Sequence, residues 1–511
     1  CDIGGESFAP GFFVWNSEVG KRSIGIQTFW FQKVCANHIV WDAVEVIDFT
    51  RKHTARVGDA LGEIRRHVEA LVAKRDERRD GFARVIKKAM REKLGDKPGF
   101  SKSLRNLAIV QAVLGKRDLT ERTLDRAKAV LEGLGDRASL ADLANDRGAV
   151  AEERGDFAAA FASYREALVL RQQLDVPDLV AESLDNVAFS SYQLDQFDNA
   201  LVYWEQALAM YRKLDDRGRM LHVEQSMAML DMARGHFSAA GERLQRTLKA
   251  AEDGQLTEGT AVALVNLAEL SLLEGRYADA GSAAARAGKI FRDRSDQRGS
   301  AEAALLGVRV SLALGDADGA GRAIAAIAAA QLNTEQRAAW LLATARREEL
   351  GGDRRRATTT LDEAATVAAQ AHSGKLAVAT LLQRVRLALA DGSPARASKQ
   401  LETLRADPVH LSEVPVRLDW LELEIASALR GGHAGEAARR YREALQLLKG
   451  IDRWSGAFVL HRLGARALAA SPAEAAAALA AADAARRQLL ADAPAAAREL
   501  LQAQLSRRLR D

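Results

Sequence analysis

The stretch AESLDNVAFSSYQLDQFDNALVYWEQALAMYRKL, residues 181–214, decides the fold of this chain. Its first half places Leu184 and Tyr192 on one side of a helix, and its second half does the same with Trp204 and Leu208. A polar break separates the two halves. Two short amphipathic helices cannot bury their apolar stripes alone, so the stretch predicts a helical hairpin that stacks on similar hairpins.

Similar hairpins recur along most of the chain at a spacing of 40 residues. One turn residue, the marker, follows the first helix of each predicted hairpin. The markers are Gly115, Gly155, Asp195, Gly235, Gly275, Gly315, Gly352, Gly392, Gly432 and Pro472. Three residues are missing between Gly315 and Gly352, after which the spacing returns to 40. Gly and Asp tolerate the left-handed backbone that ends a helix, so the markers predict the turn inside each hairpin.

Apolar residues keep a constant distance from the markers. Small residues five positions on are Ala160, Ala200, Ala240, Ala280, Ala320, Ala357, Ala397, Ala437 and Ala477. Larger residues nine positions on are Leu124, Tyr164, Trp204, Leu244, Ile324, Leu361, Leu401 and Tyr441. Alanine returns twelve positions on at Ala127, Ala167, Ala207, Ala287, Ala364, Ala444 and Ala484. Alanine lets two helix backbones approach closely, and the larger residue fills the space beside it, so these positions are predicted to be core.

Three segments resemble the second helices of tetratricopeptide repeats: GDFAAAFASYREAL (155–168), QFDNALVYWEQAL (196–208) and GHAGEAARRYREAL (432–445). The 40-residue period is similar to the variant found in bacterial regulators, multidomain kinases and kinesin-light-chain-like adaptors. The resemblance runs from about residue 101 to the end. It implies a mainly α protein, with a right-handed α-solenoid of about ten hairpins over residues 101–493 and a capping helix over residues 494–511.

Composition favours helix and excludes several classes of protein. The chain of 511 residues is 48% hydrophobic and has only 8 prolines. No uncharged apolar run is long enough to cross a membrane. Its two cysteines, Cys1 and Cys35, exclude a disulfide framework and favour a cytoplasmic location. Cys1 in first position indicates a fragment. The alternative, a lipoprotein with a lipidated Cys1, normally continues into a polar tether, whereas aromatic residues follow here.

Residues 1–100 do not follow the repeat and are predicted to form a small, truncated α+β domain. Residues 23–34 and 38–49 alternate like strands, and a helical period begins near Ala55. The segment GDKPG (95–99) predicts the domain boundary. The stretches APGFFVWNSEVGKRSIGI (9–26), CANHIVWDA (35–43) and RKHTARV (51–57) resemble a family of phage- and plasmid-encoded proteins. That resemblance implies a contact with DNA metabolism or host defence.

Two binding hypotheses concern this N-terminal part. Cys35 and His38 have metal-ligand spacing, with His53 and His67 as further candidates, but a structural zinc site usually has two such pairs. We therefore expect no metal and no cofactor. Residues 51–100 carry seven surplus positive charges. The residues that nucleic acid would contact are Lys74, Arg75, Arg78, Arg79, Arg84, Lys87, Lys88 and Arg91. Acidic residues interleave with them, as on an ordinary solvated helix face.

The first helix of each hairpin is predicted to line a concave surface. Asn106, Asn186 and Asn266 share one position in SLRNLA (103–108), SLDNVA (183–188) and ALVNLA (263–268). An amide side chain both donates and accepts, so these residues either hold the backbone of a bound peptide or stabilise hairpin stacking. Phe189, Tyr192 and Met229 form an apolar floor beside them or pack in the core. Polar neighbours completing the groove are Arg105, Asn145, Asp185, Gln225 and Glu269.

No known catalytic motif occurs in the chain: there is no phosphate-binding glycine loop, nucleophile elbow, HExxH or kinase signature. The sequence therefore predicts a non-catalytic scaffold or adaptor that binds a protein or peptide on its concave face. Two alternatives remain. One is a regulatory or sensory arm of a larger bacterial signalling protein, and the other is a mobile-element protein whose basic N-terminal domain binds nucleic acid.

Overall fold

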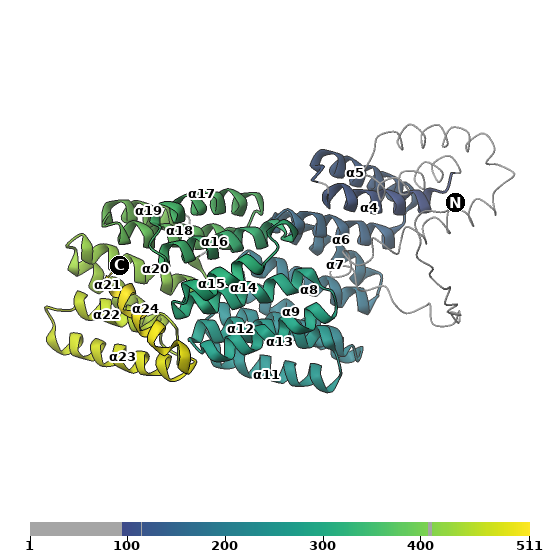
Figure 1. The fold of residues 1–511 in the computed structure, drawn as a ribbon. Coiled ribbons are helices and arrows are strands. Elements are labelled where there is room, and N and C mark those ends of the chain that lie inside the picture. The colour runs from purple at the N-terminus through teal and green to yellow at the C-terminus, as the bar shows by residue number, and fades with distance from the viewer. Residues whose placement is uncertain (1–94, 114, 407–410, 511) are drawn as a thin grey trace, which may run out of the picture. The chain divides into compact units, whose positions relative to one another are not determined.

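The computed structural model describes residues 95–113, 115–406 and 411–510, which form helices and connecting turns with no strand among them (Figure 1). The chain divides into two compact units after Gly135. The first unit contributes α4 (Lys97–Val113) and α5 (Arg117–Leu134). The predicted strands, the cysteine and histidine ligands and the basic run 74–93 lie outside the described residues. Helix α4 begins at Lys97, so the segment GDKPG supplies the start of a helix.

The second unit contains nine helical hairpins and one further helix. In chain order the helices are α6 (Arg137–Glu153), α7 (Phe157–Gln173), α8 (Pro177–Gln193), α9 (Phe197–Lys213), α10 (Arg217–Ala233), α11 (Phe237–Asp253), α12 (Thr257–Glu274), α13 (Tyr277–Asp293), α14 (Gln297–Leu314), α15 (Ala317–Ala326), α16 (Thr334–Leu350), α17 (Arg354–Gln370), α18 (Gly374–Ala390), α19 (Pro394–Ala406), α20 (Val414–Arg430), α21 (Ala434–Leu447), α22 (Ala457–Ala467), α23 (Pro472–Ala491) and α24 (Arg498–Arg510). Even-numbered helices up to α22 are the first helices of their hairpins, and odd-numbered helices are the second. The predicted α-solenoid is confirmed.

The repeat pattern of the sequence corresponds to the turns and to the core. Every marker from Gly115 to Gly432 has a positive φ, including Asp195 at 58°. The alanines five positions after the markers are at most 1% exposed from Ala160 to Ala437. Trp204, nine positions after its marker, is 1% exposed. The structure also places a left-handed residue between most hairpins, and at Asp175 and Asp215 this residue is not glycine.

The pattern is displaced by one residue in the last hairpin. The sequence predicts Ala477 and Ala484 as core positions of α23, but both are exposed. The residues that α23 buries instead are Ala478, Ala482, Ala485 and Leu489. The preceding helix α22 has only 11 residues, so the last hairpin does not have the same geometry as the earlier ones. An alanine-rich helix has no bulky side chain to fix its rotation, which explains why the sequence alone misplaced it.

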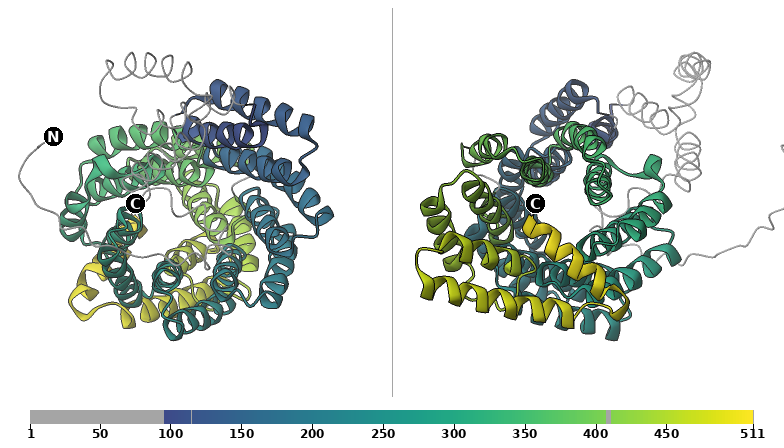
Figure 2. Two further views of the ribbon diagram at one scale, coloured as in Figure 1. Left: turned by 90° about the vertical axis from the view of Figure 1, so that its right-hand side faces the viewer. Right: turned by 60° about the vertical axis from the view of Figure 1, so that its left-hand side comes forward.

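The first helices form the inner layer of the second unit. Successive first helices pack on each other, as α10 does on α12 and α16 does on α18, whereas second helices pack mainly on the first helices that flank them. Helices that lie on the inside of a curve are closer together than those outside, so the unit curves with its first helices inward. Figure 2 shows this curvature around a common axis. Among the described residues, no helix is long and apolar enough to span a membrane.

The later part of the second unit packs against the ends of the early first helices. We call this contact the seam. The backbone N–H of Ser455 donates to the carbonyl of Leu273 at 2.8 Å, and the Ser238 hydroxyl donates to Asp452 at 3.0 Å. Gly155, at the end of α6, is so close to His372 that an added Cβ would lie 2.5 Å from the Cβ of His372. Residues about 200 positions apart are therefore in direct contact.

A polar cluster closes the seam at the end of α8. The Lys375 ammonium donates to the Tyr192 hydroxyl at 3.0 Å and lies 2.6 Å from a carboxylate oxygen of Glu413. The same ammonium lies 4.5 Å from the centroid of the Tyr192 ring. Burial raises the pKa of Tyr192. Burial alone lowers the pKa of Lys375, but Tyr192 and Glu413 outweigh it and raise that pKa. The cluster is therefore a charged contact between α8, α18 and the start of α20.

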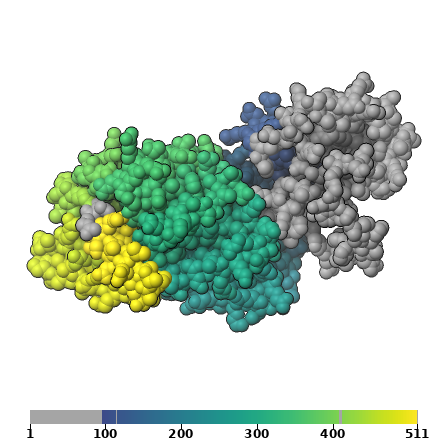
Figure 3. All heavy atoms as spheres, viewed as in Figure 1, coloured from purple at the N-terminus to yellow at the C-terminus, as the bar shows by residue number. Residues whose placement is uncertain are grey.

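The C-terminal helix α24 does not extend the stack of hairpins. It packs on two first helices, α14 and α22, which belong to hairpins far apart in the chain. A short 3-10 segment, Ala495–Ala497, connects it to the end of α23. In the space-filling view the C-terminal segment lies at the surface with one side open to solvent (Figure 3).

Candidate binding surface on the first helices

The first helices form the inner layer of the second unit. We call their half-buried and exposed side chains the inner surface. Polar contacts join neighbouring first helices along it. They are Asn186–Asn145 at 3.0 Å, His222–Asp185 at 3.7 Å, Arg309–Glu269 at 2.8 Å, Gln383–Glu349 at 3.0 Å and Arg386–Asp419 at 3.5 Å. Each contact joins adjacent hairpins, so the inner surface is held in shape by polar side chains as well as by the core.

Several of the predicted groove residues are used in these internal contacts. The Asn186 amide donates to the Asn145 carbonyl oxygen and so joins α8 to α6. Asp185 accepts from the Trp204 indole N–H at 2.9 Å. Gln225 is 4% exposed and donates to the backbone carbonyl of Gly259 at 3.0 Å. At these positions the polar side chains stabilise the stacking of hairpins.

Asn266 differs from Asn186, although the two occupy the same position of the repeat. Asn266 lies on α12 and is 9% exposed. No hydrogen bond to its side chain occurs in the described part of the chain, and its amide atoms are not sealed from solvent. Asn106, the third member of the series, is exposed on α4, and Arg105 lies next to it, so both belong to the first unit. Asn266 is therefore the member of the series that is largely buried and whose side chain has no hydrogen-bond partner among the described residues.

Glu302 on α14 is a site residue that the sequence did not single out. Its side chain is exposed, yet the surrounding protein raises the pKa of its carboxyl, with nearby Glu269 adding to the effect and Arg298 opposing it. Burial is the largest cause of this rise, so the carboxyl group is partly desolvated although the side chain is exposed. No hydrogen bond or ion pair to Glu302 occurs among residues 95–510 that the structure describes. Glu302 occupies the same position of the repeat as Asp142 and Glu182. This recurrence of acidic residues is the feature of the sequence that could have identified Glu302 as a site residue.

Arg309 and Glu269 form the ion pair next to Glu302. The two terminal guanidinium nitrogens of Arg309 both donate to the Glu269 carboxylate, one of them at 2.8 Å. This pairing raises the pKa of Arg309 despite its partial burial. Two neighbouring first helices, α12 and α14, therefore present one neutralised pair and one unpaired carboxylate.

The three predicted apolar floor residues have different surroundings. Phe189 is half-buried and meets Phe157 edge-on, with ring centroids 6.4 Å apart. Met229 is half-buried against the core. Tyr192 is 5% exposed, and its hydroxyl is bound by Lys375 in the seam. Phe189 and Met229 are thus open to a ligand, whereas the seam covers Tyr192.

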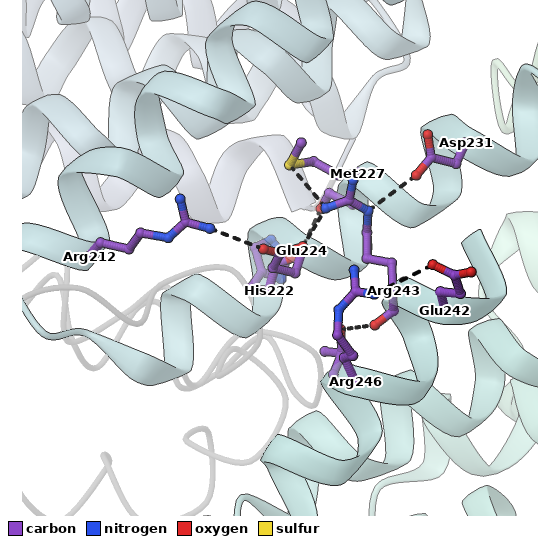
Figure 4. Close-up of polar contacts among 10 residues, drawn as sticks. Arg212, His222, Glu224, Met227, Asp231, Glu242, Arg243 and Arg246 are labelled. Atoms are coloured by element: carbon purple, nitrogen blue, oxygen red, sulfur yellow. Dashed lines mark hydrogen bonds and ion pairs between the residues drawn. The ribbon is translucent and has the colours of Figure 1, made fainter. Parts of the chain in front are cut away.

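A second charged network joins the helices α9, α10 and α11. Arg243 on α11 contacts Glu224 and lies 3.2 Å from Asp231, both on α10 (Figure 4). Arg212 approaches Glu224 at 3.5 Å from α9. Burial lowers the pKa of Arg243, but the two carboxylates outweigh it and hold that pKa above its usual value. Since these charges pair with one another within the hairpin α10–α11 and with α9, the network stabilises the packing of the three helices.

Two shallow depressions of the described surface are lined mainly by second helices. One, of about 500 Å³, lies between α15, α16 and α17 and includes Arg347 and Glu348. The other, of about 570 Å³, lies along α7. Neither includes a residue of the predicted groove. No group of three or more metal-ligating side chains occurs in the part of the chain that the structure describes.

Comparison with known proteins supports the fold and leaves the partner open. A tetratricopeptide repeat model matches residues 180–214, which correspond to α8 and α9. No curated protein matches the chain. The resemblance of residues 1–100 to phage- and plasmid-encoded proteins finds no support in these comparisons, and neither does binding of nucleic acid.

Solved structures of helical-repeat proteins are similar at low identity. A Rap protein complexed with Competence and Sporulation Factor is 17% identical, with 81% of this chain and 98% of that chain covered and a TM-score of 0.39. Yeast Tom70 is 14% identical, with 81% and 90% covered and a TM-score of 0.33. BtubC from P. vanneervenii is 16% identical, with 53% and 92% covered and a TM-score of 0.31. The chain is thus an α-solenoid of helical hairpins in which residues 180–214 match a tetratricopeptide repeat.

Proposed function

We propose that the chain is a non-catalytic scaffold whose inner surface binds a polypeptide segment of a partner protein. The observation that carries this proposal is the pair Asn266 and Glu302. These two polar side chains lie on adjacent first helices and have no bound partner among the described residues. Neighbouring positions of the repeat use the same kinds of side chain to join hairpins, as Asn186 does. A polar group left unpaired on a concave surface is a candidate to pair with a ligand.

The chemistry of the two residues indicates the class of ligand. The Asn266 amide matches the donor and acceptor of a peptide bond. Glu302 offers a carboxylate to a Lys or Arg side chain. Phe189 and Met229 supply apolar area on α8 and α10, farther along the same surface. The ligand that suits this arrangement is an extended segment with a basic residue and at least one apolar side chain.

Selection from a random peptide library displayed on phage tests the proposal. Peptides are selected on the full chain and titrated against the double variant Asn266→Ala, Glu302→Gln. We expect enriched peptides to be basic and the dissociation constant to rise about tenfold or more in the double variant, since two polar contacts are lost.

The matched control is Asn199→Ala, Glu205→Gln, which removes the same chemical groups from exposed positions of the second helix α9. Its affinity is expected to stay at the level of the natural chain. The proposal is wrong if no peptide is enriched, or if the control weakens binding as much as the inner-surface variant does.

A further inference from the structure

One face of α24 is buried and the opposite face is exposed. The buried residues are Leu501, Gln504 and Leu505, which are 0%, 6% and 3% exposed. Arg508 continues the same face with its side chain 23% exposed. These four positions follow the spacing of one helical stripe. The stripe packs on α14 and α22, which are both first helices, so α24 lies on the inner layer.

Two arginines fix the C-terminal end of α24. Arg507 donates to the backbone carbonyl of Leu350 at 2.6 Å. Leu350 is the last residue of α16, where a helix leaves its carbonyls without internal partners. Arg508 donates to both carboxylate oxygens of Glu422 on α20, at 2.8 and 2.9 Å. A single short helix thus contacts four first helices.

The surface beneath α24 has the properties of a binding site for a basic helix. Glu422 is 4% exposed, and its ion-pair partner among the described residues is Arg508. Asp419 adds a second negative charge close to Arg508. A buried carboxylate that loses its cation is left uncompensated, which is strongly unfavourable. The surface therefore requires a ligand that brings a guanidinium together with apolar side chains.

The approach of α24 to α14 is also specific. An added Cβ at Gly315, which ends α14, would lie 2.9 Å from the Cβ of Gln504 and 3.2 Å from the carbonyl oxygen of Leu500. Gly315 has a φ of 83° as well, so both its conformation and its contact favour glycine. The first half of α24 fits closely against α14, while its last turn is held by polar contacts.

From these contacts we infer that α24 is an intramolecular ligand of the inner surface and that it is displaced by a partner's basic amphipathic helix. The partner helix has two leucine-like residues four positions apart and an arginine seven positions after the first of them, as Leu501, Leu505 and Arg508 have. That the inner surface takes a segment of a partner protein rests on the proposed function, whereas the occupation of the surface by α24 and the helical form of its replacement do not. A helix of 13 residues is marginal by itself, so its docking depends on these contacts.

The test uses the full chain and a fluorescent synthetic peptide of residues 494–511. In the natural chain the site is already occupied, so the peptide binds weakly. Arg508→Glu places a negative charge against Glu422, releases α24 and exposes the site. We expect the peptide to bind this variant at least about tenfold more tightly than the natural chain, because a site closed nine-tenths of the time loses that factor.

A charge exchange and a matched control complete the experiment. The double variant Glu422→Arg, Arg508→Glu restores the ion pair within the chain and is expected to reject the natural peptide again. Arg498→Glu makes the same charge change on an exposed residue at the other end of α24 and is expected to bind as weakly as the natural chain. Circular dichroism shows whether each variant remains helical. If Arg508→Glu does not fold, Leu505→Ala opens the site without a charge change and has the same expected result.

The inference is overturned if the opened variant does not bind the peptide, or if opened and natural chains bind it equally. If the opened variant does not bind the peptide, α24 is a permanent cap. If both chains bind it equally, the peptide binds at another surface. Both concern the surface around Glu422, whereas the library experiment concerns Asn266 and Glu302, so the failure of one proposal is distinguishable from the failure of the other.

Discussion

The helices α6–α14 and α15–α23 are built from one repeat but differ in regularity. Each of the helices α6–α14 has 17 or 18 residues. Among the later ones, α15 has 10 residues, α19 has 13, α21 has 14 and α22 has 11. A shorter helix buries less area against its neighbours. The later helices gain additional contacts at the seam, where they pack on the ends of α6–α14.

This difference indicates that the two regions have different roles. The regular helices can form a curved surface from nearest-neighbour contacts alone, as expected for a solenoid. The irregular helices depend in addition on contacts with residues about 200 positions away, such as Ser238 with Asp452. The helices α6–α14 thus supply the framework and the unpaired groups of the inner surface. The helices α15–α23 pack against them at the seam.

The largest expected effect compares two tryptophans from the two regions. Trp204 on α9 is 1% exposed and donates to Asp185, whereas Trp340 on α16 is half-buried and donates to the Ile324 carbonyl at 3.4 Å. We expect Trp204→Ala to lower the free energy of unfolding by about 3–5 kcal/mol and Trp340→Ala by roughly half as much. Urea denaturation followed by circular dichroism measures both. Equal losses would show that the irregular region is packed as tightly as the regular one.

The next prediction tests the seam with two glycines of the same backbone conformation. Gly155 and Gly392 have the same φ of 71°. An added Cβ at Gly155 would lie against His372. An added Cβ at Gly392 would have no atom within 4 Å apart from those of its chain neighbours. Gly392→Ala is expected to cost about 1–2 kcal/mol through its left-handed backbone. Gly155→Ala is expected to cost a further 1–3 kcal/mol, roughly, through overpacking. If the two melting temperatures fall by the same amount, the seam contributes nothing at this point.

A smaller effect separates the two asparagines of the regular region. Asn186→Ala removes the hydrogen bond to Asn145 and is expected to lower the free energy of unfolding by about 0.5–1.5 kcal/mol. Asn266→Ala removes no internal hydrogen bond, and alanine is the better helix former, so stability is expected to hold or rise by a few tenths of a kcal/mol, roughly. Thermal unfolding of both variants is the measurement. A loss at Asn266 as large as that at Asn186 would mean that both residues only stabilise stacking.

The smallest effect concerns the protonation of Glu302. Its pKa is raised in the folded chain, so the charged form is disfavoured and the folded state binds a proton more readily than the unfolded state. This contribution favours folding at pH below 4.5 and is lost as the pH rises through the folded pKa. Because the side chain is exposed, Glu302→Gln is expected to stabilise the chain at pH 7 by only a few tenths of a kcal/mol, roughly.

The difference in the free energy of unfolding between Glu302→Gln and the natural chain should become smaller when unfolding is measured near pH 4. The matched control is Glu205→Gln, an exposed position on α9. A gain that stays constant with pH, or an equal gain in the control, would contradict the enclosed position of Glu302.

The repeat pattern was sufficient to predict the core positions of the hairpins except in the last one. Ala200 and Trp204 lie in the core as expected because each contact of this kind repeats every 40 residues and leaves a visible pattern. The seam has no such pattern. Lys375 and Tyr192 are 183 residues apart, and nothing in either repeat indicates that they meet. For that reason the sequence predicts Tyr192 either in an apolar floor or in the core, and it gives no sign that the seam covers this residue.

The candidate site was predictable only in part. The repeat position of Asn186 and Asn266 placed both on the first helices, but it could not indicate that one side chain is bound to Asn145 and the other is not. That difference depends on the residue 41 positions earlier, on the preceding first helix. It is Asn145 for Asn186 and Gln225 for Asn266, and Gln225 donates to the Gly259 carbonyl instead. Glu302 was missed because its surroundings include Glu269, which lies on a different helix of the repeat.

Photo-crosslinking tests the central claim, that the inner surface is the binding surface, most directly. The crosslinking amino acid p-benzoylphenylalanine replaces either Val262 on the first helix α12 or Val202 on the second helix α9. Val262 shares its repeat position with Glu302, whereas Val202 is 49% exposed on a second helix. A library-selected peptide is then irradiated with each full-length variant. We predict a crosslinked product from position 262 and none from position 202. A product from position 202 alone would place the ligand on the second helices and contradict the account.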